Sequence, residues 1–269
     1  MREFQRCLAP SHRWYTKASN ELSTQACTSR RDGKRQDDTA ADILDRSVSK
    51  GEVIGFEARH YDLLMNVITA GTYPLFIRRV VHNINIVPDD DILVLGSGTG
   101  RNACLMHRYL SDEGSILGLD IGEEMLVQAQ HRCHSHENVS FEKRRIDQPL
   151  PYSEAYDKVF MSFVVHGFVQ EDRESIIENA FWALRPGGEF LILDYAECEP
   201  SESSWPVRMV FRAECPLATD FVRRNWEEIL SAHGFDRFEA HYYYFGHVRL
   251  LAAHKPDLPY RALSKNSIN

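Results

Sequence analysis

A short apolar run followed by a glycine-rich turn constrains this chain more than any other segment. Residues 92–95 read ILVL and residues 96–100 read GSGTG. A continuous apolar run of this kind is typical of a strand buried on both faces of a parallel sheet. Alternate glycines let the backbone turn tightly and approach a ligand closely. A dinucleotide fingerprint would place its third glycine where this chain has Arg101, so the turn disfavours a pyrophosphate ligand.

Strand and helix patterns alternate after this turn. Strands are predicted at SILGLD, at VSFEKR, at YDKVFMSF and at EFLILDY, with helices from about Asn102 to Tyr109, through Met125, Leu126 and Ala129, and over 171–184. Pro186, Gly187 and Gly188 are expected to close the last of these helices. A further helix passes through Trp226, and strands at 238–245 and 248–254 are expected to form a hairpin. The pattern predicts a Rossmann-like doubly wound α/β fold, with a mostly parallel seven-stranded sheet and an antiparallel C-terminal edge hairpin.

Composition divides the chain into four segments. Residues 1–41 are polar and lack a helical or strand period, so we expect a flexible polar N-terminal tail. Residues 42–87 carry apolar side chains at helical spacing and are expected to form a helical lid or substrate segment. Residues 88–255 are the predicted main domain, and residues 256–269 are a C-terminal tail.

Charge and cysteine content exclude several classes of protein. Acidic residues exceed basic ones, 39 to 31, and no basic stripe suits a nucleic acid partner. No apolar run of about 18 residues and no apolar signal region occur, so we expect a cytoplasmic protein without a transmembrane segment. The six cysteines are scattered without CxxC spacing, which predicts reduced thiols and no metal site.

Two carboxylates stand where an adenosine would need them. Asp120 ends the second strand, twenty residues after Gly100, and can accept hydrogen bonds from both hydroxyls of a ribose. Asp147 follows the third strand and can accept from the amino group of adenine, with Ile146 and Met125 as apolar walls. Alone, a glycine loop is often only a tight turn, and a strand-end aspartate is often a helix cap. Their order on alternating strands and helices predicts an adenosine site.

These motifs resemble those of class I S-adenosylmethionine-dependent methyltransferases over roughly residues 88–254. The resemblance rests on ILVLGSGTG, ILGLDIGEEML, RID at 145–147, YDKVFMSFVVHGF and ALRPGGEFLILDY. Within this superfamily the chain is most similar to the ubiquinone/menaquinone C-methyltransferase group (methyltransferase type 11). YDLLMNVITAGTYPLFIRRVV and HVRLLAAHKP support that placement more loosely. The resemblance implies methyl transfer from S-adenosylmethionine to a small apolar molecule, such as a quinone precursor, on carbon or oxygen.

The resemblance also implies which residues hold the cofactor. The glycine loop would contact its methionine part, Asp120 its ribose and Asp147 its adenine amino group. Ser162 would lie beneath the sulfonium, and Tyr61 would close over the cofactor. The predicted set is Tyr61, Gly96, Ser97, Gly98, Thr99, Gly100, Asp120, Ile121, Met125, Ile146, Asp147 and Ser162. One departure is Val94, where the family usually carries an acid two residues before the first glycine.

Two further residues are candidates for proton transfer. His166 follows the fourth strand and Asp194 ends the fifth, where a doubly wound sheet opens its crevice. Structural alternatives for them are a backbone-bonded histidine and a strand-end cap. The methyl acceptor is expected at the helices before Pro88 and at the stretch between Asp194 and Trp226. Apolar side chains in that stretch would suit it, although core packing would explain them equally well. Those side chains are Trp205, Met209, Phe211 and Phe221.

Two other functions stay open. The acceptor would be an amine, thiol or metalloid if Cys198 and Cys215 took part. A non-catalytic module that only binds S-adenosylmethionine is the third reading, and Val94 is the hint for it. The partners considered are a small-molecule methyl acceptor and, as an assembly, a homodimer.

Overall fold

The computed structural model describes residues 71–203, 205–213 and 216–257 of the chain. Tyr61 and most of the predicted helical segment 42–87 lie outside the described residues, as does the predicted tail 1–41. From the helical segment, only α2 (Tyr73–Asn83) belongs to the described part. The division into four segments therefore stays a prediction.

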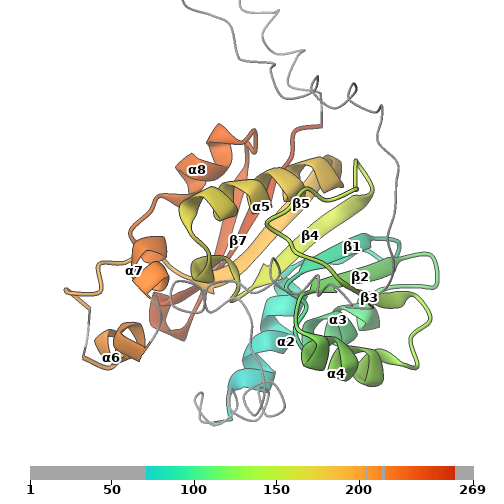
Figure 1. The fold of residues 1–269 in the computed structure, drawn as a ribbon, viewed down its shortest axis with the longest axis horizontal. Coiled ribbons are helices and arrows are strands. Elements are labelled where there is room, and N and C mark those ends of the chain that lie inside the picture. Colours follow the sequence, from blue (N-terminus) through green and yellow to red (C-terminus); the bar gives the residue numbers. More distant parts are fainter. Residues whose placement is uncertain (1–70, 204, 214–215, 258–269) are drawn as a thin grey trace, which may run out of the picture. The chain divides into compact units, whose positions relative to one another are not determined.

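A seven-stranded sheet forms the centre of the described part (Figure 1), with strand order β3-β2-β1-β4-β5-β7-β6. Strands β1 to β5 pair in parallel, whereas β7 pairs antiparallel with both β5 and β6. The strands are β1 Asp91–Leu95, β2 Ser115–Asp120, β3 Val139–Lys143, β4 Tyr156–Ser162, β5 Leu184–Tyr195, β6 Phe238–Tyr243 and β7 Val248–His254. This topology confirms the predicted α/β class and its antiparallel edge hairpin.

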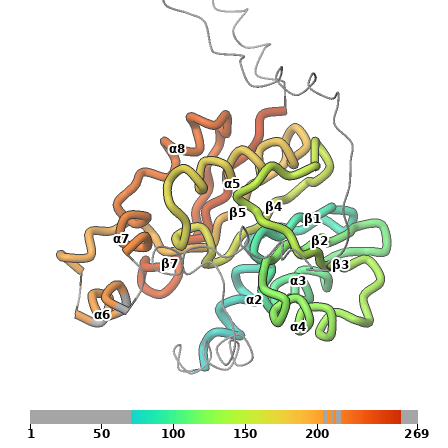
Figure 2. Tube along the Cα trace, in the orientation of Figure 1, coloured from blue at the N-terminus to red at the C-terminus, as the bar shows by residue number. Residues whose placement is uncertain are grey.

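Helices follow the strands, and Figure 2 traces this alternation along the chain. After α2, the helices in the described part are α3 Arg101–Met106, α4 Glu123–Cys133, α5 Gln170–Ala183, α6 Trp205–Ala213, α7 Pro216–Val222 and α8 Trp226–Ala232. Three short 3₁₀ turns are η1 His107–Tyr109, η2 Val165–Gly167 and η3 Tyr244–Gly246.

The central strand β1 is buried on both faces, which explains its unbroken apolar run. Ile92 and Val94 pack in one core cluster with side chains of α2 and α3. Leu93 and Leu95 pack in a second cluster with side chains of α5, α7 and α8. Because successive side chains point to opposite faces, a strand between two helical layers needs apolar residues at every position.

Proline caused two differences from the sequence prediction. Strand β5 begins at Leu184, before Pro186, because a register shift in its pairing with β4 accommodates the irregular start. Helices α6 and α7 were not predicted, and each contains a proline in its first turn. Pro206 is the second residue of α6 and Pro216 the first of α7. In the first turn of a helix a proline lacks only an N–H that has no helical partner.

A disulfide joins Cys104 of α3 to Cys133 at the end of α4, with their Cα atoms 5.8 Å apart. The prediction of reduced thiols is therefore wrong for this pair. The two cysteines are 29 residues apart in sequence, so no local spacing could indicate their pairing. They meet because α3 and α4 follow neighbouring parallel strands. Among the described residues, Cys198 keeps a free thiol.

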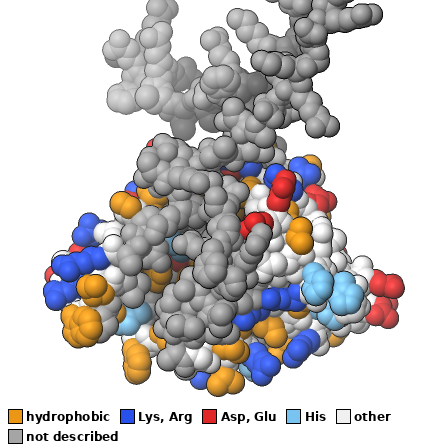
Figure 3. All heavy atoms as spheres, turned by 60° about the horizontal axis from the view of Figure 1, so that its bottom comes forward, with side chains coloured by type: hydrophobic (Ala, Val, Ile, Leu, Met, Phe, Trp, Pro, Cys, Tyr) orange, Lys and Arg blue, Asp and Glu red, His pale blue; other side chains and the backbone are white. Residues whose placement is uncertain are grey.

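No helix in the described ranges is long and apolar enough to cross a membrane. On the face in Figure 3, exposed hydrophobic side chains stand in small separate groups. Scattered exposure of this kind is ordinary for a protein surface.

Candidate functional site

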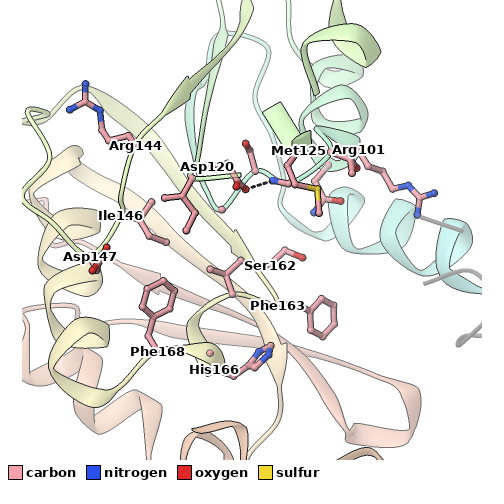
Figure 4. Close-up of a pocket in the computed structure, with 18 of the residues that line it drawn as sticks. Arg101, Asp120, Met125, Arg144, Ile146, Asp147, Ser162, Phe163, His166 and Phe168 are labelled. Atoms are coloured by element: carbon pink, nitrogen blue, oxygen red, sulfur yellow. Dashed lines mark hydrogen bonds between the residues drawn. The ribbon is translucent and has the colours of Figure 1, made fainter. Parts of the chain in front are cut away.

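A pocket opens at the carboxyl ends of β1, β2 and β4 (Figure 4). In open α/β sheets, ligands bind at this edge of the parallel strands. Most of the predicted cofactor residues line this one pocket, and His166 joins them. Those residues are Gly96, Ser97, Gly98, Thr99, Asp120, Ile121, Met125, Ile146, Asp147 and Ser162. Of the rest, Gly100 does not line the pocket and Tyr61 lies outside the described residues.

Backbone conformation and the close approach of neighbouring segments explain the three glycines of the loop. All three have positive φ, 72° at Gly96, 52° at Gly98 and 72° at Gly100, which residues with side chains rarely adopt. A Cβ on Gly96 would also lie 2.6 Å from Cγ2 of Val164, so the loop approaches the segment after β4 closely. A Cβ on Gly100 would lie 2.9 Å from Cα of Ala129. Gly100 therefore lets α4 pack against the loop, which is a different role from the predicted ligand contact.

Asp120 holds the two loops of the pocket together. Its Oδ2 accepts a hydrogen bond from the backbone N–H of Gly98 at 2.7 Å, and its Oδ1 accepts from that of Gly122 at 2.9 Å. Figure 4 shows the first of these bonds crossing from β2 to the glycine loop. Each carboxylate oxygen has a second lone pair that can accept from a ribose hydroxyl. The same side chain can therefore fix the loops and bind a sugar.

The far end of the pocket has apolar walls and one anchored carboxylate. Ile121, Met125, Ile146 and Phe168 line it, and such surfaces suit the faces of a purine. Asp147 is nearly buried, with 4% of its side chain exposed, and Arg145 pairs with it through Nη2 at 2.5 Å. Sequence reading missed this arginine. Its pairing fixes the position of the carboxylate at the pocket wall, where an amino group can still reach a remaining lone pair.

The glycine-loop end contains buried polar atoms that have no hydrogen-bond partner in the described structure. These are Oγ of Ser97 and Oδ1 of Asn102. Buried polar groups are normally paired, so a ligand with polar groups fits this end. Val94, at the position of the family's acid, is 2% exposed and packs in the core cluster that contains Met106 and Phe160. Burial explains why the family's acid is absent here, because a carboxylate buried among apolar side chains would lower the stability of the fold.

His166 and Asp194 form a hydrogen-bonded dyad. Nδ1 of His166 lies 2.8 Å from Oδ1 of Asp194, and the same oxygen accepts from the backbone N–H of Tyr195 at 2.8 Å. Asp194 is buried, whereas the His166 side chain is 13% exposed and lines the pocket. A carboxylate at Nδ1 favours the tautomer whose Nε2 is an acceptor. The two residues predicted separately therefore come together, in an arrangement that can take up a proton.

A buried arginine fixes the turn that carries His166. Arg173 of α5 is fully buried, and it donates to the carbonyl oxygens of Val165 at 3.2 Å and His166 at 3.1 Å. Its Nη1 pairs with Asp220 of α7 at 2.6 Å. Burial lowers the pKa of Arg173, while the bond to Asp220 opposes this shift. The arginine thus joins η2 to α7.

Several lining residues were missed from the sequence. They are Tyr73, Arg101, Asn102, Arg144, Phe163, Val164, Gly167 and Phe168. Arg101 and Asn102 directly follow the glycine loop, and Phe168 lies in the motif that contains His166, so proximity to a motif was the available signal. Phe163 has a φ of 54°, a strained conformation that clusters at functional sites. Nothing in its sequence neighbourhood indicates that strain.

The four acceptor-pocket candidates do not line this pocket. Phe221 is 1% exposed and packs on Trp226, with ring centroids 4.4 Å apart, as core packing would predict. Phe211 contacts Tyr195, whereas Trp205 and Met209 are exposed. Their role in acceptor binding stays a prediction.

The cysteines proposed for a thiol or metalloid reaction gain little support. Cys198 is partly buried, and burial raises the pKa of its thiol. A higher pKa leaves less of the reactive thiolate at neutral pH. Cys215 lies outside the described residues. No group of three potential metal ligands occurs among the described residues either.

Part of this chain is similar in sequence to known proteins. A family model described as a methyltransferase domain matches residues 92–188. The ubiquinone/menaquinone biosynthesis C-methyltransferase of Xanthomonas oryzae is 28% identical over 156 residues, which cover 57% of this chain and 61% of that protein. The chain thus matches about three-fifths of that relative's length.

Two solved structures share the fold at low sequence identity. A putative O-methyltransferase from Nostoc punctiforme superposes with a TM-score of 0.59 and 16% identity, over 70% of this chain and 58% of that one. Human N-acetylserotonin methyltransferase, solved with S-adenosylmethionine, gives a TM-score of 0.54 and 18% identity, over 69% and 53%. Residues 92–188 thus match a methyltransferase domain, and the strand order agrees with the Rossmann-like fold of the solved methyltransferases.

Proposed function

We propose that the protein transfers the methyl group of S-adenosylmethionine to carbon or oxygen of a small apolar acceptor of the quinone-precursor type. The observation that carries the proposal is the His166–Asp194 dyad at the pocket that the glycine loop and Ser162 line. The similarity to the ubiquinone/menaquinone C-methyltransferase supports the acceptor class. Cytoplasmic location and homodimer assembly stay predictions.

The pocket residues fit the adenosyl part of the cofactor. Asp120 accepts from the ribose hydroxyls while its backbone bonds keep it in place. Met125 and Phe168 cover the faces of the adenine, and Asp147 accepts from its amino group. These contacts align the cofactor, which is the main task in an in-line methyl transfer.

The dyad supplies the base that such an acceptor needs. When bound, S-adenosylmethionine supplies an electrophilic methyl group. Nε2 of His166 takes the proton from the acceptor's hydroxyl or ring carbon, while Asp194 keeps Nδ1 protonated and stabilises the imidazolium. Phe163 and Val164 give this part of the pocket an apolar wall that excludes water.

Two measurements test this proposal in order. Titration with S-adenosylmethionine and S-adenosylhomocysteine should show binding of both, because the two ligands share the adenosyl and amino-acid parts. Transfer of a labelled methyl group is then measured to a hydroquinone that lacks a ring methyl, to an amine and to a thiol. We expect transfer to the hydroquinone. No binding of either ligand would contradict the activity, and transfer only to the amine or thiol would contradict the acceptor class.

Variants of the dyad test the base. His166→Ala should lower the turnover number by about 10² to 10⁴ fold with unchanged cofactor affinity, and Asp194→Asn should lower it less. His241→Ala is the matched control, because His241 is exposed on β6 and lies outside the pocket. A His166→Ala variant with the wild-type rate would remove the dyad from the proposal.

A further inference from the structure

The loss of the family's acid at Val94 leaves one end of the cofactor to be bound in another way. The methionine part of S-adenosylmethionine carries an α-carboxylate and an α-ammonium, both charged at neutral pH. Val94 is buried in the core with Ile92 and Met106, so its strand offers no polar side chain there. Any replacement has to come from other residues at the glycine-loop end.

The first two residues of α3 supply polar groups at this end. Arg101 and Asn102 line the pocket beside Ser97. Oδ1 of Asn102 and Oγ of Ser97 are buried and have no hydrogen-bond partner in the described structure. Ser97 as a whole is only 8% exposed. A ligand that brings complementary donors and acceptors would satisfy such groups.

Arg101 adds the charge that a carboxylate requires. Its guanidinium carbon lies 5.1 Å from the centre of the Tyr73 ring, and Tyr73 also lines the pocket. A cation over an aromatic face is attracted to the ring, and a guanidinium carries its N–H groups in a planar fork that matches a carboxylate. Figure 4 shows Arg101 and Asp147 at opposite sides of the pocket. The cation thus stands at the loop end, where the α-carboxylate of the cofactor would lie, and away from the neutral adenine.

We propose that Arg101, Asn102 and Ser97 bind the amino-acid end of S-adenosylmethionine, in place of the acid that Val94 replaces. Arg101 and Oγ of Ser97 donate to the α-carboxylate, and Oδ1 of Asn102 accepts from the α-ammonium. The assignment rests on the proposed cofactor binding and adds residues that the resemblance does not provide. It makes the contact between α2 and α3, through Tyr73 and Arg101, part of the cofactor site.

Comparing two ligands tests the assignment without measuring methyl transfer. S-adenosylhomocysteine carries the amino-acid end, whereas 5′-methylthioadenosine has the same adenosine and a thioether but lacks that end. Calorimetric titration of the full chain with both ligands gives a selectivity ratio. Arg101→Met should weaken S-adenosylhomocysteine binding by about tenfold to a hundredfold, as expected for a charge-assisted bond, and methylthioadenosine binding by less than about threefold. Asn102→Leu should act in the same direction.

Arg144→Met is the matched control. Arg144 is the other cation that lines the pocket, on the side of Ile146 and Asp147, and its variant should leave the selectivity ratio unchanged. Arg101→Lys keeps the charge but lacks the planar guanidinium, so it should give an intermediate selectivity ratio. It also serves as a second test if Arg101→Met does not fold. Equal weakening of both ligands by the Arg101 variants, or no change, would overturn the assignment. If the wild type bound neither ligand, the proposed function itself would fail.

Discussion

The part of the molecule that contains the glycine loop, residues 91–162, and the part that contains the His166–Asp194 dyad, residues 163–257, are held together differently. We refer to them by their main proposed roles as the cofactor side and the acceptor side. On the cofactor side, short motifs at successive strand ends supply the pocket, and Asp120 bonds to loops 2 and 22 residues away. On the acceptor side, the deciding contacts join distant segments, such as His166 with Asp194 and Arg173 with Asp220. Local sequence motifs therefore indicate a binding loop, whereas the proposed base and the residues that hold it come together only through tertiary packing.

The largest effect is expected at Arg173, whose removal tests the acceptor side. Arg173→Met leaves three carbonyl oxygens and Asp220 without their buried donor. A buried acceptor left without its donor costs about 1 to 3 kcal/mol, and three carbonyl oxygens lose theirs, so the free energy of unfolding in urea should fall by at least about 3 kcal/mol. Arg224→Met is the control, because Arg224 pairs with the same Asp220 at the surface and its loss should cost at most about 1 kcal/mol. Equal losses would show that burial of Arg173 is not decisive.

The disulfide of the cofactor side should have the next largest effect. Cys104 and Cys133 close a loop with a sequence separation of 29. The chain-entropy relation for a loop of this length gives about 3 to 4 kcal/mol. The double variant Cys104→Ser with Cys133→Ser should lose this much unfolding free energy, as measured in urea without reductant. Cys198→Ser is the control, and a double variant as stable as the wild type would show that the crosslink adds nothing.

The sequence was informative where function lies within a few residues of a strand end. ILVL, GSGTG and Asp120 predicted the sheet, the turn and the glycine-loop end of the pocket, because these features depend on local backbone conformation. The strained Phe163 depends on the surrounding structure, so no spacing indicated it. Arg145 lies in the RID motif two residues from Asp147, but the motif alone did not indicate that the two side chains pair. The disulfide and helices α6 and α7 were missed for related reasons. Cysteines 29 residues apart pair only after folding, and a proline indicates a helix start only when the following turn is known.

Replacing Asp120 tests the proposed ribose contact on the cofactor side. Asp120→Ala should weaken binding of S-adenosylmethionine by about 1 to 3 kcal/mol, since buried hydrogen-bond partners lose their acceptor. Calorimetric titration measures this change. Because the carboxylate also bonds to Gly98 and Gly122, the thermal midpoint is recorded in parallel to show that the variant is folded. A folded variant with unchanged affinity would remove the ribose contact.

The smallest effect is expected at an exposed ion pair of the acceptor side. Arg223 donates to Glu199 at 2.8 Å, and Ser201 donates to the same carboxylate. These bonds, that of Arg223 first, lower the pKa of Glu199 from 4.5 to about 2. A lowered folded-state pKa means that the pair stabilises the fold above the unfolded value and loses this contribution as the pH falls toward 2.

An NMR titration of the Glu199 carboxyl group checks this shift. Arg223→Met should move the pKa back toward 4.5, whereas Arg212→Met, which removes another exposed arginine, should leave it unchanged. The stability change at neutral pH should be small, because exposed pairs are screened by water and salt. The acceptor side would then contain both a strong and a weak ion pair, Arg173 with Asp220 and Arg223 with Glu199. Burial of the arginine, rather than position on one side of the molecule, would be the property that separates them.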